Sequence, residues 1–120
     1  MTDQRFEVQD RPEESRYVLV DHDAANPADQ IIGTEDYVDV DGPDGVQRVL
    51  FHTEVSADHA GQGLASLLVR GAVDDVVARG YAVVPVCPYV AAWLPKHPGY
   101  DDHVVKPGPD HLRAVDSRQK

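Results

Sequence analysis

The sequence contains one cysteine, Cys87, among its 120 residues. A single cysteine cannot form an intrachain disulfide, and it excludes a metal site built from four cysteines. No apolar run approaches the roughly 18 residues that a membrane-spanning helix needs. Basic residues are also few, 11 against 21 acidic ones, and the formal net charge of −10 argues against nucleic acid as the main partner. The polar, acidic start "MTDQRFEVQD" is no secretory signal, so we expect a cytoplasmic protein.

A chain of this length favours one domain, spanning residues 1–120, around one hydrophobic core. Residues 16–22, 31–40 and 46–55 are rich in β-branched and aromatic residues, as strands are, and 5–9 is a shorter candidate. Short links such as "DGPDG" (41–45) are dense in turn formers and predict an antiparallel meander. A period of two divides residues 46–55 between two faces: Val49, Phe51, Thr53 and Val55 against Leu50, His52 and Glu54.

The second half of the chain predicts a crossover helix and a further strand. Residues 64–80 carry an apolar stripe at helical spacing that ends at Gly80, a typical C-cap glycine. A connection this long predicts that the buried-type strand 81–86 lies parallel to 46–55. A short helix over 89–97 follows, and the polar residues 106–120 are expected to form a loose tail. The fold class is therefore mixed α/β (α+β), with an antiparallel meander plus one parallel strand.

The segment "HTEVSADHAGQGLAS" (52–66) joins the fourth strand to the long helix. Glycines at a helix start let the backbone approach an anion, and the free N–H groups there favour phosphate. The spacing does not fit a dinucleotide fingerprint, because Ser66 stands where a third glycine is needed. It does not fit a Walker A loop either, since "GQGLAS" has no lysine.

Four segments in this order resemble the GNAT-type N-acetyltransferases, and most closely their minimal, single-domain subgroup, also called the CG type. They are "HTEV" (52–55), "GQGLAS" (61–66), "VVPVCPYVAAWL" (83–94) and "HPGY" (97–100). Gly61 and Gly63 match the family's glycine signature, whereas Asp58 stands where glutamine or arginine is usual. Gly99 stands where the subgroup often has glutamate.

The resemblance implies acetyl-CoA as the ligand. The implied pyrophosphate site is the backbone around Ala60, Gly61, Gln62, Gly63, Leu64 and Ala65. The strand edge at Thr53 and Val55 is expected to hydrogen-bond the pantetheine arm. Lys96 and His97 are candidates for the adenosine phosphate side.

Acyl transfer from a thioester to an amine needs a neutral amine and a protonated leaving thiolate. The resemblance implies that strands 46–55 and 81–86 part where the acyl group sits, with Cys87, His52 and Glu54 at the opening. An imidazole suits a general base, and a thiolate at Cys87 can accept the acyl group if His52 activates it. Cys87 as pocket lining remains the alternative. His22, His59, His103 and His111 show no metal-ligand spacing, and no metal is inferred.

The function we expect is transfer of an acetyl group from acetyl-CoA to an amine that the sequence does not identify. Two alternatives stay open. A non-catalytic acyl-CoA sensor is favoured by Asp58 and by the small size of the chain. A partner-binding module would need the glycine segment to be only a turn. We expect no nucleic-acid partner and no membrane partner.

Overall fold

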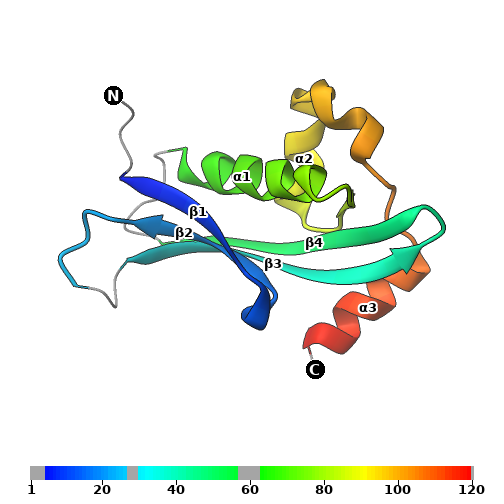
Figure 1. The fold of residues 1–120 in the computed structure, drawn as a ribbon, viewed down its shortest axis with the longest axis horizontal. Coiled ribbons are helices and arrows are strands. Elements are labelled where there is room, and N and C mark those ends of the chain that lie inside the picture. The colour runs from blue at the N-terminus through cyan, green and yellow to red at the C-terminus, as the bar shows by residue number, and fades with distance from the viewer. Residues whose placement is uncertain (1–4, 27–29, 57–62, 120) are drawn as a thin grey trace.

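A computed structural model describes residues 5–26, 30–56 and 63–119 of the chain (Figure 1). Within these ranges the strands are β1 (Phe6–Arg11), β2 (Arg16–Asp21), β3 (Ile31–Gly42), β4 (Gly45–Val55) and β5 (Ala82–Pro85). The α-helices are α1 (Leu64–Ala78), α2 (Pro88–Trp93) and α3 (Pro109–Gln119). Short 3-10 turns cover Pro12–Glu14, Leu94–Lys96 and Pro98–His103. No helix among the described residues is long and apolar enough to cross a membrane.

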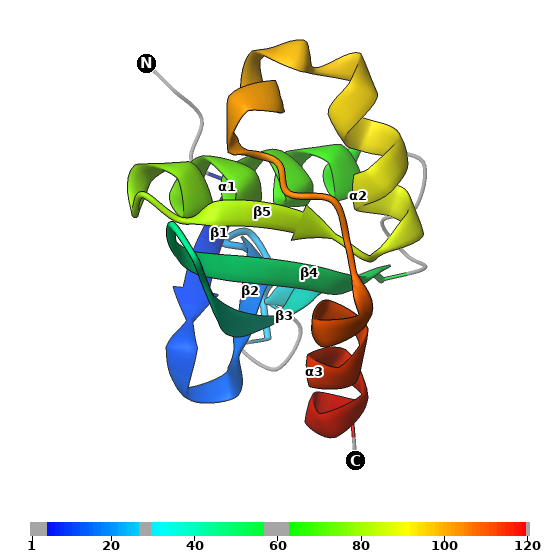
Figure 2. The same cartoon turned by 90° about the vertical axis from the view of Figure 1, so that its right-hand side faces the viewer.

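The five strands form one sheet in the order β1-β2-β3-β4-β5. The first four are antiparallel neighbours, and β5 pairs with β4 in parallel, from Gln47↔Ala82 to Leu50↔Pro85. Helix α1 connects β4 to β5 and lies on one face of the sheet, whereas α3 lies against the opposite face (Figures 1 and 2). The predicted mixed sheet, with its antiparallel meander and parallel last strand, is confirmed.

A bulge in β4 changes which side chains share a face. Asp36 of β3 pairs with His52, but the next residue, Tyr37, pairs with Leu50, so Phe51 has no partner in this register. One extra residue shifts the alternation of side chains along a strand. Leu50 and Val55 therefore both pack into the core beneath α1. A strict period of two predicted that Leu50 and Val55 lie on opposite faces of the strand, and this prediction is wrong.

The apolar stripe of α1 forms the centre of the core. It buries Leu64, Leu68, Val69, Ala72, Val73 and Val76 against the sheet. The helix ends at Ala78, and Gly80 follows with φ +76°, the left-handed conformation expected of a glycine after a helix. The predicted helix 64–80 is thus two residues shorter, and its C-terminal glycine has the expected role.

Gly71 allows α1 to approach β1 closely. A Cβ atom at this position would lie 2.7 Å from Cβ and Cγ2 of Val8. We expect Gly71→Ala to lower the unfolding free energy by about 1–2 kcal/mol, because overpacking outweighs the gain in helix propensity. Urea denaturation measures the change, and Val8→Ala in the same chain should restore most of it. A Gly71→Ala variant more stable than the wild type would contradict the close approach.

The expectation of a loose C-terminal tail is not met, because Pro109–Gln119 form α3. His111 anchors this helix: its Nε2 lies 2.7 Å from Gln47 Oε1, and its Nδ1 accepts the N–H of Gly108 at 2.9 Å. At the other end, Arg118 Nη2 donates to the carbonyl of Glu14 at 2.8 Å. The residues that anchor this helix are polar, a histidine and an arginine. The polar composition of the segment therefore predicted a loose tail where a packed helix forms.

Candidate active site

Strands β4 and β5 separate at Leu50. Their pairing ends at Leu50↔Pro85, and the Leu50 carbonyl accepts N–H groups from Val86 at 3.1 Å and Cys87 at 2.9 Å. After Cys87 the chain turns into α2. The edge of β4 from Phe51 to Val55 consequently has no strand beside it on the β5 side within the described residues. Free main-chain donors and acceptors are the requirement for holding an amide-bearing ligand along this edge.

Cys87 lies at this point of separation. Its side chain is buried, with 3% of the residue exposed, and it belongs to the core cluster beneath α1. Its Sγ atom is 3.0 Å from Thr53 Oγ1 of β4. The partner of the thiol among the described residues is therefore a hydroxyl.

Thr53 also contacts a buried carboxyl group. It pairs across the sheet with Glu35 of β3, and its Oγ1 donates a hydrogen bond to Glu35 Oε1. Glu35 is fully buried, and its Oε2 has no hydrogen-bond partner in the described part of the chain. Burial raises the pKa of Glu35 to about 8, although the hydrogen bond from Thr53 partly opposes this. Near neutral pH this carboxyl is largely protonated.

His52 and Glu54 do not join Cys87. Neighbouring side chains on a strand point to opposite faces, so both lie on the face opposite Thr53. Their side chains are 51% and 75% exposed, and His52 Nε2 lies 3.4 Å from Glu54 Oε1. The expected imidazole–thiol contact is absent from the described structure.

The glycine segment is described only in part. Ala60, Gly61 and Gln62 lie outside the described residues. Gly63 has φ +72°, a left-handed conformation, and its carbonyl accepts the N–H of Leu67 at 3.2 Å as α1 begins. Leu64 is buried and Ala65 is half-buried in the first turn of the helix. The start of α1 therefore has a glycine whose conformation a side chain would oppose.

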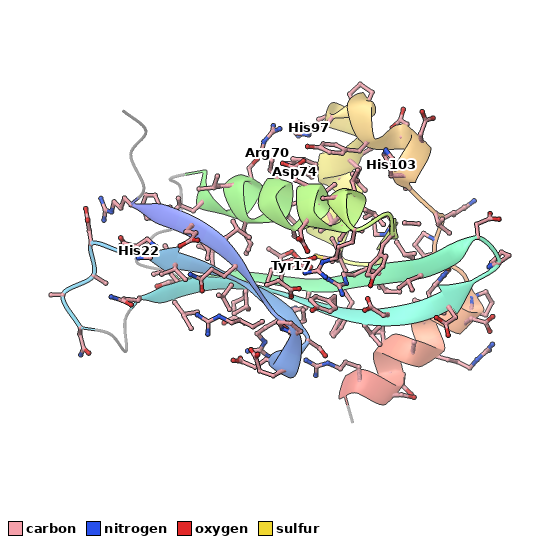
Figure 3. All side chains as sticks on the ribbon, in the orientation of Figure 1. Tyr17, His22, Arg70, Asp74, His97 and His103 are labelled. Carbon is pink, nitrogen blue, oxygen red and sulfur yellow. The ribbon has the colours of Figure 1, made fainter. Side chains whose placement is uncertain are left out.

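Lys96 and His97 lie beyond α2, beside Trp93. The His97 ring stacks on Trp93 at 3.7 Å between centroids, and its Nδ1 lies 2.8 Å from the Trp93 carbonyl oxygen. Trp93 Nε1 donates to Ser66 Oγ of α1 at 2.9 Å. Arg70 and Asp74 extend from the outer side of α1 near His97 (Figure 3). Trp93 thus links the start of α1 to the segment that carries Lys96 and His97.

No group of three potential metal ligands occurs among the described residues. The chemistry available at the point of separation is that of a thiol, a hydroxyl and a buried carboxyl group.

A family model described as GCN5-related N-acetyl-transferase matches residues 16–103. The chain belongs to this family. Its members are N-acetyltransferases, and the resemblance of the sequence to the GNAT-type N-acetyltransferases is confirmed. Comparison with curated proteins gives no match.

Two solved structures resemble this N-acetyltransferase. The solution structure of a GCN5-like protein from Staphylococcus aureus has a TM-score of 0.60 at 19% identity, covering 91% of this chain and 97% of its own. A crystal structure of ribosomal-protein-alanine N-acetyltransferase from Brucella melitensis biovar Abortus has a TM-score of 0.48 at 21% identity, covering 78% of this chain and 65% of its own. The Staphylococcus aureus structure supports the same fold over nearly the whole length of both chains.

Sequence reasoning missed Glu35 in this N-acetyltransferase. Carboxylates are almost never fully buried, so "TED" in a strand is expected to face solvent. The available signal was position: Glu35 alternates with Gly33 and Tyr37, and all three are buried. Its role depends on Thr53, whose direction the bulge determines.

Proposed function

We propose that this protein transfers an acetyl group from acetyl-CoA to an amine acceptor by way of Cys87. One observation carries the proposal: the only cysteine of the chain lies where β4 and β5 separate, with its thiol bonded to Thr53. A buried thiol that is merely part of the core needs no such partner. Here the hydrogen bond fixes the position of Sγ relative to the free edge of β4.

The residues of this chain fit acetyl-CoA as the acyl donor. The free edge of β4 at Thr53 and Val55 offers main-chain groups to the amides of the pantetheine arm. The backbone of residues 60–65 is proposed to bind the pyrophosphate, since N–H groups at a helix start favour anions. Lys96 and His97 are proposed on the adenosine phosphate side.

The proposed reaction has two balanced steps. Acetyl-CoA supplies an activated thioester carbonyl. In the first step the Cys87 thiolate forms a bond to the acetyl carbon, and the thiol of CoA is released with the proton that Cys87 gave up. In the second, a neutral amine attacks the acetylated Cys87; the amide forms, and the proton lost by the amine returns to Sγ.

Incubation with acetyl-CoA should add one acetyl group to the wild-type protein, as measured by intact-protein mass. Cys87→Ala should show no increment and should lose most acyl transfer in an amine-acceptor screen, while it still binds CoA in a titration. Full turnover by Cys87→Ala would reduce the cysteine to pocket lining. Binding without any turnover in the wild type would instead favour an acyl-CoA sensor, and no binding would favour a partner-binding module.

Gly63 and Gly80 provide a matched test of the pyrophosphate site. Both have positive φ at opposite ends of α1, and a Cβ atom at either position would have no atom within 4 Å. Alanine should therefore cost each about 1–2 kcal/mol of stability through backbone strain alone. We expect Gly63→Ala to weaken CoA binding at least about tenfold, or about 1.4 kcal/mol, and Gly80→Ala to leave it unchanged. Equal CoA affinity in the two variants would place the pyrophosphate elsewhere.

A further inference from the structure

Three side chains from three separate segments form one line of polar contacts inside the core. Glu35 Oε1 accepts from Thr53 Oγ1, and Thr53 Oγ1 lies 3.0 Å from Cys87 Sγ. Glu35 and Cys87 are 0% and 3% exposed. The second carboxyl oxygen of Glu35, Oε2, has no partner among the described residues. The structure therefore keeps an incompletely satisfied carboxyl group two contacts from the thiol, where an apolar side chain would stabilise the core more.

We propose that Glu35 holds the proton of Cys87, which it receives through the hydroxyl of Thr53. The use of this proton relay in acyl transfer rests on the proposed function. Glu35 acts through Thr53 and is a positioning residue, whereas Cys87 is the group that meets the substrate. This assignment replaces the His52 partner that the sequence favoured.

The transfer is balanced. The Cys87 S–H bond breaks and its proton goes to Thr53 Oγ1, while the hydroxyl proton of Thr53 goes to the Glu35 carboxylate. The transfer takes place in the fraction of molecules in which Glu35 is ionised: before it the negative charge is on Glu35, and afterwards it is on Sγ, so the total charge of the buried group does not change. Burial raises the pKa of Glu35 to about 8. Once ionised, a carboxyl group with so high a pKa is a stronger base than an ordinary glutamate, so it can accept a proton that an ordinary carboxylate would leave on the thiol.

The surroundings of Glu35 supply few competing charges. Tyr17 of β2 pairs opposite it, but the Tyr17 hydroxyl contacts Asp75 at 2.7 Å and Arg48 at 2.8 Å. Asp36 is adjacent and disfavours ionisation of Glu35. From β4, Thr53 faces Glu35 and His52 lies on the other side of the sheet. The face of α1 over this region is apolar: Leu64, Leu68, Val69, Ala72, Val73 and Val76. Helix α3 lies against the opposite face of the sheet (Figure 1), where the side chains of His52 and Glu54 stay exposed.

The test is the titration of the thiol in the full chain without acetyl-CoA. Because Cys87 is the only cysteine, the ultraviolet absorbance of the thiolate, after subtraction of the same signal from Cys87→Ala, reports this residue alone. Two coupled groups titrate in two steps. We expect the wild type to form part of its thiolate in a first step and the rest at higher pH. Glu35→Gln should show one step, without the part at higher pH, because an amide carries no charge that opposes the thiolate.

Alkylation of the thiol by iodoacetamide at mildly alkaline pH provides a second measurement. Ionised Glu35 opposes a second negative charge on the neighbouring thiol, so the thiolate fraction and the alkylation rate should rise in Glu35→Gln, by at most about tenfold for each pKa unit of that repulsion. Thr53→Val should behave like Glu35→Gln, and Thr53→Ser should retain the wild-type rate because it keeps the hydroxyl. If Glu35→Gln does not fold, the two Thr53 variants decide. Glu54→Gln, which removes a carboxyl group from the opposite face, should leave the titration unchanged.

The relay would be overturned if Glu35→Gln or Thr53→Val showed the same thiol titration and the same alkylation rate as the wild type. The outcome is independent of the proposed function. If acetyl-CoA leaves the wild type unmodified while Glu35→Gln still shifts the thiol titration, the acyl transfer fails and the relay holds. If the wild type and Glu35→Gln become acetylated at equal rates, the relay fails and the transfer holds.

Discussion

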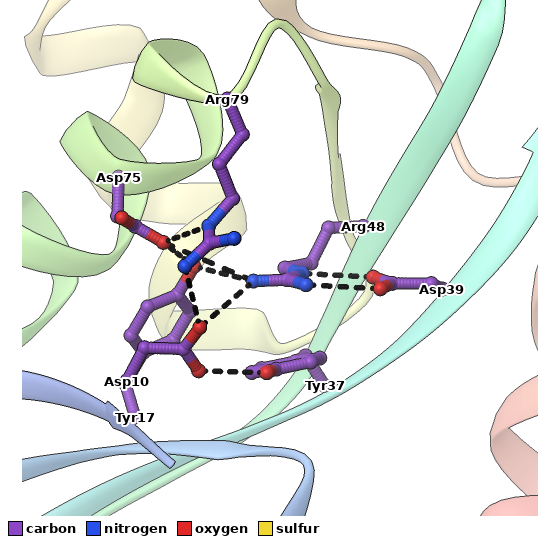
Figure 4. A network of polar contacts seen from close by, with 7 residues as sticks. All are labelled: Asp10, Tyr17, Tyr37, Asp39, Arg48, Asp75 and Arg79. Atoms are coloured by element: carbon purple, nitrogen blue, oxygen red, sulfur yellow. Dashed lines mark hydrogen bonds and ion pairs between the residues drawn. The ribbon is translucent and has the colours of Figure 1, made fainter. Parts of the chain in front are cut away.

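Arg48→Met should lower the unfolding free energy by about 3–5 kcal/mol, the loss that follows when one member of a buried ion-pair network is removed. Arg48 is 4% exposed and bonds both oxygens of Asp39, with Nε to Oδ1 at 2.8 Å and Nη2 to Oδ2 at 2.9 Å (Figure 4). Its guanidinium lies 3.8 Å from the centre of the Tyr37 ring. These bonds raise the pKa of Arg48 further above its usual range, so the charge is permanent.

Two more carboxylates depend on this charge. Arg48 Nη1 lies 3.7 Å from Asp10 Oδ2 and 3.9 Å from Asp75 Oδ2. Without Arg48 the one cation left to these carboxylates among the described residues would be Arg79, which contacts both but is 40% exposed. Water screens an exposed pair, so Arg79→Met should lose about 1 kcal/mol or less.

Urea denaturation of Arg48→Met, Arg48→Lys and Arg79→Met measures these differences. Lysine keeps the charge but cannot bond both oxygens of Asp39, so Arg48→Lys should fall between the wild type and Arg48→Met. Equal losses in Arg48→Met and Arg79→Met would mean that burial does not determine the contribution of this network.

Glu35→Gln should change how the stability of the protein depends on pH. The pKa of Glu35 is about 8 in the folded protein, because of burial, against an ordinary value of 4.5. The folded state therefore keeps a proton that the unfolded state releases, and stability falls as the pH rises. The loss begins near pH 4.5 and is complete near pH 8. The difference between the two pKa values corresponds to a loss of about 5 kcal/mol in the free energy of unfolding.

The measurement is the difference in unfolding free energy between Glu35→Gln and the wild type at several pH values. This difference should move in favour of the variant by several kcal/mol from acid to mildly alkaline pH, because glutamine cannot ionise. Glu54→Gln is the matched control: its carboxyl group is 75% exposed, and its difference from the wild type should stay flat. A flat curve for Glu35→Gln as well would show that Glu35 is ionised in the folded protein.

The sequence predicted the parts of the fold that depend on repeated patterns. The stripe of α1, the antiparallel meander and the parallel strand before Cys87 all follow from periodicity and connection length. The bulge does not follow from these patterns. Its extra residue, Phe51, is as apolar as the residues before it, so the apolar run in the sequence gives no sign of an irregular pairing. Helix α3 does not follow from them either, since its anchors His111 and Arg118 belong to residue types that are usually exposed.

The candidate site was predicted in part for the same reason. The position of Cys87 follows from the end of the predicted strand 81–86, since a residue directly after a strand stays near its edge. The partner of Cys87 depends on which face of β4 is presented, and a single-residue irregularity decides that face. Glu35 then follows from Thr53 through direct cross-strand pairing, and its alternation with Gly33 and Tyr37 is the one local pattern that marks it.

The bulge at Phe51 determines which side chain of β4 faces Cys87. If β4 kept all its residues but paired with β3 without this bulge, strict alternation from Leu50 would turn each later side chain to the other face. Thr53 would then face away from the core, and the inward positions would go to its neighbours His52 and Glu54. The thiol would meet an imidazole in place of a hydroxyl, with every residue of the cluster still present in the chain. In this sheet, the count of residues between two hydrogen bonds decides which acid–base chemistry the cysteine encounters.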